Sequence, residues 1–546
     1  MKKNLFRLFV FSIVLVTGVI IWRAVPNRKG AADKEAEIRY KAENPVTIDS
    51  CLINEEDGRI VLEISTEDSP SSDDEYFYLF ILNSYEEEIA EDKTYALRKK
   101  KNKNAVFSLE AGIFDKFVIA VKKDQQYEAV SRPHYITNPE AVSIFKYNGE
   151  HPSSKKGLLI DPDKLMSQEL DELGIGHAAY NIPVSRILGH SEEDDYPAIF
   201  YDYQGKRYIF NGRVMAEYDL IFRTLTEKGI EVTAIILNDI ADGYPWLIHP
   251  LSRSGIGKPP YYAFNADDEQ GAEYLAAIGS FLVERYSGAM NGRGMVSNWV
   301  ISNEINARKE WNYMEYVDLD LYVREYVKAY RIFYNAIKSV NSACGVYISL
   351  DNQWNRINIL TQSYKARDVL DEFNRQIKEE GNIDWGLAIH PYNKPLSRTD
   401  TWKSSIYVTD TFNTPVVTMA NIHVITDYMR QQEFLTDEGE VRSIILSELG
   451  YTSSKGEERQ AAAIVYAYKM AEANPYIDSI LFSRQTDATE EIERLGLYLG
   501  LNNTDGSHKF VYDIYKYMDT EKEEKYTEFA KEIIGISDWK EITDRN

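Results

Sequence analysis

The sequence predicts an α/β protein whose main unit is a (β/α)8 (TIM) barrel, preceded by a small all-β sandwich and an N-terminal signal or membrane segment. Three observations support this fold class. From Lys156 onward, short apolar segments alternate with long amphipathic segments, as in βα units around a parallel sheet. Between residues 45 and 140, short apolar segments are separated by turn residues, which indicates antiparallel strands. Near the start of the chain, an uncharged run is flanked by basic residues.

Length and charge limit the classes of function. The 546 residues are too many for one ordinary domain and suggest about two or three folding units. Asp and Glu outnumber Lys and Arg by 86 to 62, which gives a net charge of -24. Such an acidic surface repels phosphate backbones, so nucleic acid is not expected as a partner. Cys51 and Cys344 are the two cysteines, and they form neither a disulfide framework nor a thiol metal cluster.

The N-terminal run extends from Leu8 to Trp22 between basic flanks, as in an export signal. It is shorter than the ~20 apolar residues of a comfortable membrane span. No clear cleavage site or lipid-attachment cysteine follows it. An uncleaved signal-anchor over residues 1–27 is therefore favoured over a cleaved signal peptide, with residues 28–44 as a polar tether. The expected location is the outer cell surface, attached to the membrane, or the medium if the segment is cleaved.

Residues 45–140 predict a β-sandwich, with strand segments at 60–64, 76–82, 105–109 and 116–121. A carbohydrate-binding module and a passive spacer are both open, and the spacer is favoured.

Residues 156–519 predict the barrel, and residues 520–546 form a charged tail. The eight expected strands are 176–181, 231–238, 261–265, 295–302, 345–350, 384–389, 443–447 and 478–482. Together they occupy more than the ~250 residues of a typical barrel, so several loops must be long. Residues 198–211, after the first expected strand, predict a hairpin that turns at Gln204-Gly205 and walls a cleft at the barrel's C-terminal face.

Two glutamates follow predicted strands 4 and 7. Glu304 comes directly after the apolar run that begins at Trp299, and Glu448 directly after the run that begins at Ile444. In a barrel, the carboxyl ends of the strands meet at one mouth. A pair of carboxylates at this place is the arrangement that cleaves glycosidic bonds. Either glutamate alone is equally well explained as a strand-end residue paired with a neighbouring Arg or Lys; the pair at strands 4 and 7 favours a site.

The pair Asn303-Glu304 after strand 4 with Glu448 after strand 7 resembles the clan A glycoside hydrolases. Over nearly the whole barrel, the chain also resembles an uncharacterised bacterial family of glycosidase-like domains. The segments that carry this second resemblance are 348–354, 385–392, 446–450 and 460–463. The resemblance implies that Glu304 is the acid/base, that Glu448 is the nucleophile, and that Asn303 hydrogen-bonds the sugar hydroxyl next to the anomeric carbon.

One segment departs from the clan A pattern. Clan A barrels commonly place an aromatic platform at the end of strand 8, whereas residues 483–487 are polar and charged. This difference could signal an acidic sugar or a site architecture specific to this protein.

Further site candidates lie at other strand ends. His390 and Tyr392 alternate after strand 6, so both side chains can point to the mouth. Asn181, Asn238 and Asp351 end strands 1, 2 and 5, where sugar contacts and loop capping are equally good explanations. Trp354 is either a stacking platform or a core residue, and Arg484, like Tyr392, is a possible donor to Glu448.

The resulting prediction is a retaining glycoside hydrolase that cleaves an extracellular oligo- or polysaccharide. The alternative is an inactive surface glycan-binding protein on the same barrel. No HExxH motif, P-loop or Gly-rich dinucleotide turn is present, and the eight histidines are scattered. Neither a metal nor a cofactor is therefore expected, and the sequence indicates no particular oligomeric state.

Overall fold

A computed structural model of the protein describes residues 44–147, 149–191, 195–239, 243–257, 259–288 and 292–544. The expected signal-anchor and all of the expected tether except Asn44 lie outside these residues. In the described ranges, no helix is both long enough and apolar enough to cross a membrane.

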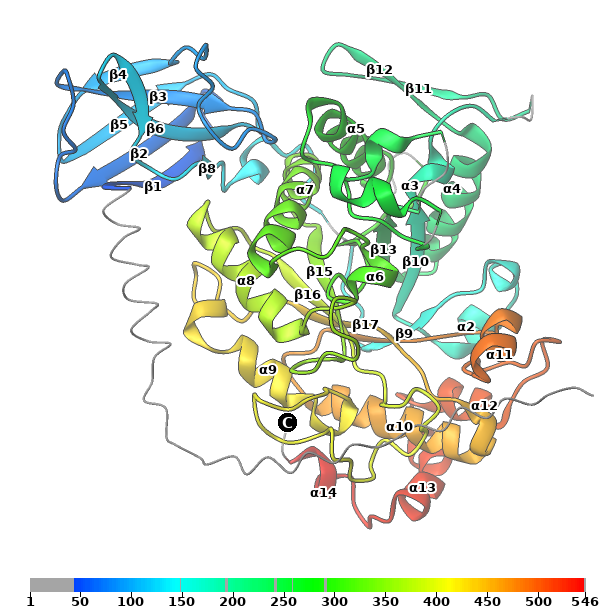
Figure 1. Ribbon diagram of the computed structural model, residues 1–546. Helices are drawn as coiled ribbons and strands as arrows, with labels where there is room; N and C mark the ends of the chain where they lie inside the picture. The colour runs from blue at the N-terminus through cyan, green and yellow to red at the C-terminus, as the bar shows by residue number, and fades with distance from the viewer. Residues whose placement is uncertain are drawn as a thin grey trace, which may run out of the picture.

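Two antiparallel sheets form the N-terminal part (Figure 1, blue). The first contains β1 (Val46–Ile53), β2 (Ile60–Thr66) and β5 (Asn104–Leu109). The second contains β3 (Tyr76–Leu82), β4 (Leu97–Lys100), β6 (Lys116–Lys123), β7 (Gln126–Ala129) and β8 (His134–Tyr135). Inward-pointing residues of both sheets, such as Leu62 and Leu79, share one apolar core.

This β-rich part packs against the outside of the barrel, beside α7 (Leu319–Val340) and α8 (Ala366–Glu379) (Figure 1). The backbone N–H of Tyr135 donates to the carbonyl of Glu380 (2.8 Å), and the Asn335 amide donates to the carbonyl of Ile113 (2.7 Å). Backbone and side-chain hydrogen bonds thus join the two parts of the chain.

Eight parallel strands close into a barrel, as the sequence predicts. They are β9 (Lys156–Leu159), β10 (His177–Pro183), β13 (Glu231–Leu237), β14 (Asn298–Ile301), β15 (Gly345–Asp351), β16 (Gly386–His390), β17 (Ile444–Leu449) and β18 (Ser479–Phe482). Pairing of β18 with β9 closes the ring. Outside it lie α4 (Gly212–Glu227), α5 (Glu269–Arg285), α7, α8, α10 (Glu457–Ala473) and α12 (Phe510–Tyr517). In the tail, α13 (Glu523–Ile534) packs on α10, and α14 (Lys540–Thr543) follows.

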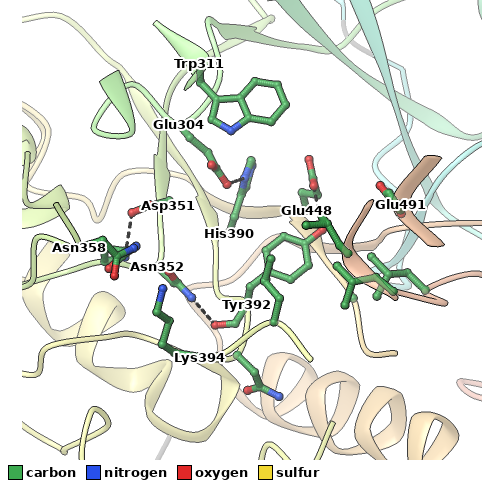
Figure 2. Close-up of a pocket in the computed structure, with 17 residues that line it drawn as sticks. Glu304, Trp311, Asp351, Asn352, Asn358, His390, Tyr392, Lys394, Glu448 and Glu491 are labelled. Atoms are coloured by element: carbon green, nitrogen blue, oxygen red, sulfur yellow. Dashed lines mark hydrogen bonds and ion pairs between the residues drawn. The ribbon is translucent and has the colours of Figure 1, made fainter. Parts of the chain in front are cut away.

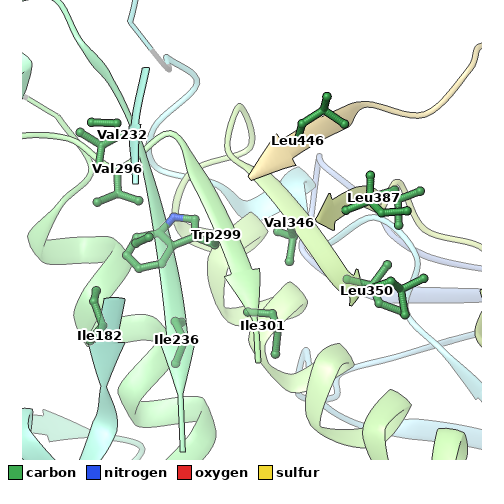
Figure 3. Packing of buried hydrophobic residues seen from close by; sticks show 14 of the residues in the cluster. Ile182, Val232, Ile236, Val296, Trp299, Ile301, Val346, Leu350, Leu387 and Leu446 are labelled. Atoms are coloured by element: carbon green, nitrogen blue, oxygen red, sulfur yellow. The ribbon is translucent and has the colours of Figure 1, made fainter. Parts of the chain in front are cut away.

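The barrel strands are apolar on both faces because both faces are buried. In β14, Trp299 and Ile301 pack into the layer between the strands and the outer helices (Figure 3). Val300, between them, belongs to a separate cluster inside the barrel with Ile235 and Leu481. This explains why these strands are continuous apolar runs in the sequence rather than alternating ones.

The sequence prediction missed one barrel strand and included one segment that is not a barrel strand. The predicted number of eight strands is therefore still correct. The first barrel strand is β9, which the sequence prediction missed because it is four residues long and begins with a lysine. The predicted strand 261–265 is not in the barrel; Tyr262 and Phe264 form only isolated bridges with loop residues. The predicted first strand is therefore the barrel's second, whereas Glu304 still follows strand 4 and Glu448 still lies at the end of strand 7.

The predicted hairpin exists but stands elsewhere. It consists of β11 (Ile199–Tyr203) and β12 (Lys206–Phe210), and it turns at Gln204-Gly205, where both residues have positive φ (47° and 78°). It packs on α5, where the rings of Phe210 and Phe281 stack with centroids 3.6 Å apart. The expectation that it walls the cleft at the mouth was wrong, because its apolar face is buried against an outer helix.

Candidate active site

A cavity of about 370 Å³ opens at the carboxyl ends of the middle barrel strands (Figure 2). Both predicted carboxylates, Glu304 and Glu448, line it. Other side chains along its wall include Trp311, Asp351, Asn352, Gln353, Asn358, His390, Tyr392, Lys394 and Glu491. These residues come from the ends of different strands and from the loops that follow them, so the closed barrel is what brings them together.

Glu304 is held on a bent backbone directly after β14. Ser302 and Glu304 both have positive φ (63° and 38°), a region that costs a non-glycine residue roughly 1–2 kcal/mol and that clusters at functional sites. The backbone N–H of Glu304 donates to Ser349 Oγ (3.0 Å), which anchors the turn to the neighbouring strand β15. The Glu304 carboxylate then contacts His390, with 2.7 Å between Oε1 and Nδ1.

His390 links the two halves of the site. Its other ring nitrogen lies 3.0 Å from the hydroxyl of Ser447, the residue before Glu448. Burial lowers the pKa of the imidazole, but its hydrogen bond to Glu304 and the negative charges around it more than offset this effect, so the pKa of His390 is raised. In Figure 2 the ring lies between the two glutamates.

Glu448 accepts a hydrogen bond from the Tyr392 hydroxyl (2.8 Å). Burial and the adjacent carboxylate hold the pKa of Tyr392 well above its ordinary value, so the phenol stays a neutral donor. The predicted placement of His390 and Tyr392 on one side of the mouth is what the structure shows, and each of them contacts one of the two glutamates.

Asp351, at the end of β15, is a third carboxyl group in the cavity wall. It accepts hydrogen bonds from the Asn306 amide (2.5 Å) and from the backbone N–H of Gln353 (2.8 Å). Burial, followed by the negative charge of Glu304, raises the pKa of Asp351 to about 7. The site therefore contains a carboxyl group that titrates near neutral pH.

Three other candidates lie at or near the mouth, and no hydrogen bond or ion pair joins their side chains to either glutamate. Asn303 is buried beside Glu304 and accepts a weak hydrogen bond from Ser349 Oγ (3.4 Å). Asn181 and Arg484 line a second cavity, of about 500 Å³, on the opposite side of the barrel mouth. The Arg484 guanidinium pairs with Glu491 (2.5 Å). The prediction that Arg484 supports Glu448 therefore finds no contact in the structure.

Two candidates have structural roles, and their placement in the site was wrong. The Asn238 amide is buried and donates to the carbonyls of Leu247 (2.9 Å) and Ala263 (3.2 Å), so it fastens the loop after β13. Trp354 is fully buried, and its indole N–H donates to the carbonyl of Phe412 (3.0 Å). A ring without an exposed face cannot stack on a sugar.

Trp354→Ala should therefore act on stability rather than on ligand binding. Removal of a fully buried tryptophan should lower the free energy of unfolding by about 3–5 kcal/mol, because it leaves a cavity in the core. Denaturant unfolding followed by circular dichroism measures this change, with exposed Ile406→Ala as the control. A loss below about 1 kcal/mol would show that the indole is not part of the packed core.

The sequence prediction missed Trp311, an aromatic side chain of the cavity. Trp311 follows β14 and stacks on Tyr261, with ring centroids 5.0 Å apart and an angle of 13° between the planes. Tyr261 lines the second cavity, so this pair of rings lies between the two cavities. The loop after strand 4 thus supplies an aromatic surface of the kind that sugar faces stack against. Its helix, α6 (Arg308–Trp311), is too short to give a periodic signal in the sequence.

In the described part of the chain, one group of side chains has the ligand types and spacing of a metal site: His249, Asp267 and Glu325. The ammonium group of Lys328 lies among them, 3.1 Å from Asp267 and 3.0 Å from Glu325. A lysine thus supplies the positive charge in this cluster, which lies outside both cavities of the mouth.

Among solved structures, a family 39 glycoside hydrolase from Bacteroides cellulosilyticus WH2 is 14% identical over 88% of this chain and 80% of its own (TM-score 0.45). Another is β-glucuronidase 2 of Bacteroides uniformis, 11% identical over 86% of this chain and 49% of its own (TM-score 0.38). A family 1 β-glucosidase from Thermotoga maritima is 15% identical over 67% of this chain and 86% of its own (TM-score 0.39).

No curated protein sequence matches the chain. A family profile matches residues 148–542, which include the whole barrel, and its description is "Family of unknown function (DUF5722)". This match confirms the expected resemblance to an uncharacterised family, and the chain belongs to the DUF5722 family.

Proposed function

We propose that this protein is a retaining glycoside hydrolase that cleaves O-glycosidic bonds by double displacement. The observation that carries the proposal is the placement of Glu304 and Glu448 in one cavity, at the ends of barrel strands 4 and 7. Each carboxylate has a different polar partner: His390 for the first and Tyr392 for the second. Two carboxyl groups in different environments are what separate acid/base and nucleophilic roles require.

In the first step, Glu304 gives a proton to the leaving oxygen while Glu448 attacks the anomeric carbon. The glycosidic bond breaks and a glycosyl-enzyme ester forms. In the second step, water attacks the same carbon, Glu304 takes the proton of that water, and the Glu448 carboxylate leaves. For these two steps a retaining enzyme needs its carboxyl groups ~5–5.5 Å apart, which is too close for a water molecule between them.

The hydrogen bond to Tyr392 supports Glu448 in its role, because a neutral phenol donor stabilises an ionised carboxylate. Glu304 and His390 share one hydrogen bond, so the proton required for the first step belongs to the pair. The raised pKa of His390 extends the pH range over which the pair holds this proton.

His390→Gln should shift the pH dependence of kcat/KM. The pKa of His390 is higher in the folded protein than in a free imidazole. The stabilising contact of protonated His390 with Glu304 is therefore fully present below the ordinary pKa of imidazole, and it is lost as the pH rises through the raised pKa. In the variant a carboxyl group alone holds the proton, and carboxyl groups ordinarily titrate below imidazole. We expect the alkaline limb to move to lower pH and kcat to fall about 10²-fold. An unchanged profile would exclude His390 from the acid/base pair.

We propose that the enzyme works outside the cytoplasm on an oligo- or polysaccharide, tethered at the cell surface by its N-terminal segment. The uncharged run from Leu8 to Trp22 between basic flanks supports this location. Fractionation of cells that express the full chain, followed by protease treatment of intact cells, tests it. A protein that stays in the soluble cytoplasmic fraction would contradict it.

The activity is tested by incubating the full chain with aryl glycosides and with plant, bacterial and host polysaccharides. Release of reducing ends or of the aryl group is the expected result. Glu304→Ala and Glu448→Ala, assayed side by side, separate turnover by this site from contaminating activity. Binding without hydrolysis across the panel would instead indicate a glycan-binding protein.

A further inference from the structure

We propose that one end of the cavity binds an anionic group of the substrate, a carboxylate or a sulfate ester carried by a sugar ring. The inference rests on the proposed glycoside hydrolase activity and specifies its substrate class. The binding surface, called the anion patch below, consists of the side chains of Gln353, Asn358 and Lys394, with Arg356 adjoining them.

The positive charge of the anion patch comes from Lys394, two residues after Tyr392. Its side chain lines the cavity and is partly buried (Figure 2). It makes no hydrogen bond or ion pair with any residue that the structure describes. Arg484, a cation at the mouth near the other end of the cavity, is by contrast paired with Glu491. The charge of Asp351 acts on Lys394, but the two groups do not form an ion pair. Since a partly buried ammonium group without a paired carboxylate is costly, Lys394 favours a ligand that brings the negative charge.

The two amides of the anion patch are oriented by Arg356. Its guanidinium donates to Gln353 Oε1 (3.0 Å) and to Asn358 Oδ1. These bonds use the amide oxygens and leave the NH₂ group of each amide as a donor. No described residue accepts a hydrogen bond from either NH₂ group.

The anion patch therefore presents mainly donors, namely one ammonium group and two NH₂ groups, while each amide oxygen already accepts a hydrogen bond from Arg356. A sugar hydroxyl both donates and accepts, whereas carboxylate and sulfate oxygens only accept, and their bonds to a charged donor are about twice as strong as neutral ones. Arg356 adds a second positive charge: its guanidinium lies over the ring of Tyr407, 5.0 Å from the ring centroid, and pairs with no described carboxylate. An acceptor-only, negatively charged group thus fits the anion patch better than a neutral sugar does.

The carboxyl group beside the anion patch opposes anion binding less than its charge suggests. The backbone N–H of Gln353 donates to Asp351, which places this carboxyl group next to the anion patch. Burial and the charge of Glu304 raise its pKa to about 7, which favours the neutral form more than in an ordinary carboxyl group. Its repulsion of a bound anion is reduced accordingly.

The test measures binding by isothermal titration calorimetry to the full chain carrying Glu448→Gln, so that turnover does not interfere. The ligands are oligosaccharide pairs of identical ring and linkage: uronate oligosaccharides with their carboxyl-reduced forms, and sulfated oligosaccharides with their desulfated forms. For at least one pair, the anionic member should bind about 10-fold tighter, by an amount that falls as salt is added.

Lys394→Met should remove this 10-fold preference and leave the affinity for the neutral member unchanged, whereas Lys394→Arg should retain it. Lys103→Met, an exposed lysine of the β-rich part, is the matched control and should have no effect. A preference in the uronate pairs alone identifies a carboxylate as the ligand group, and one in the sulfated pairs alone identifies a sulfate.

The proposal is overturned if neutral members bind as tightly as anionic ones, if Lys394→Met weakens both members equally, or if no pair binds. Hydrolysis by the wild-type chain is measured separately. Lys394-dependent anion binding without hydrolysis would refute the proposed function and leave the anion patch intact. Hydrolysis of neutral glycans without any preference for charge would support the proposed function and refute the anion patch.

Discussion

Glu448→Ala should lose activity by about 10⁴-fold or more on any glycoside that the wild type cleaves, because no nucleophile remains to form the glycosyl-enzyme ester. Azide fits the space left by the carboxylate and attacks the anomeric carbon directly. We therefore expect added azide to restore turnover of aryl glycosides and to give a glycosyl azide of inverted configuration, which NMR of the product identifies.

Glu440→Ala, an exposed glutamate in the loop before β17, is the matched control and should keep wild-type activity. Full activity of Glu448→Ala on a natural substrate would remove this residue from the mechanism. Azide products of retained configuration would reassign it to the acid/base role.

Glu304→Ala should have an effect that depends on the leaving group. Proton transfer by a positioned side chain contributes about 10²–10⁴-fold, so we expect a loss of this size on substrates with a poor leaving group. Aryl glycosides whose phenol is acidic need little protonation, and their bond cleavage should be affected far less. Steady-state kinetics across a series of aryl glycosides measures this dependence as the slope of log kcat/KM against phenol pKa.

The control is Glu438→Ala, an exposed glutamate in the loop before β17. It should leave the slope unchanged. An equal loss for good and poor leaving groups in Glu304→Ala would show that the residue binds or positions the substrate rather than protonates it.

The two glutamates could be predicted from the sequence because each interrupts or follows an apolar run that only a buried parallel strand explains. A charge at the end of such a strand has one favourable place, the mouth of the barrel. His390 and Tyr392 could be predicted because side chains of an extended segment alternate. Strand position and alternation are properties of the local sequence. The placement of these four residues was therefore correct although one barrel strand was missed and another was wrongly predicted.

The first barrel strand could not be predicted because it begins with Lys156, a charged residue that is buried. Its ammonium group donates to the carbonyls of Tyr515 (3.3 Å) and Met518 (2.9 Å) at the end of α12, about 360 residues away in the sequence. A partner so distant in the chain leaves no local signal, and this compensation is what makes a lysine acceptable in a barrel strand.

Residues on loops were the least predictable part of the site. Trp354 and Asn238 stand at or just beyond strand ends, yet their side chains turn toward the core and toward a loop. Trp311 and Lys394, by contrast, line the cavity although the segments that carry them show no periodic pattern of apolar residues. The direction of a side chain on a long loop depends on packing against the rest of the barrel, which the sequence pattern does not contain.

In double displacement, one sugar is transferred to Glu448 and then to water. Proton NMR of the first product released from an aryl glycoside, recorded before the sugar mutarotates, tests it most directly. Double displacement predicts the same anomeric configuration as in the substrate. A first product of inverted configuration would exclude double displacement, because it would require water to attack the substrate directly.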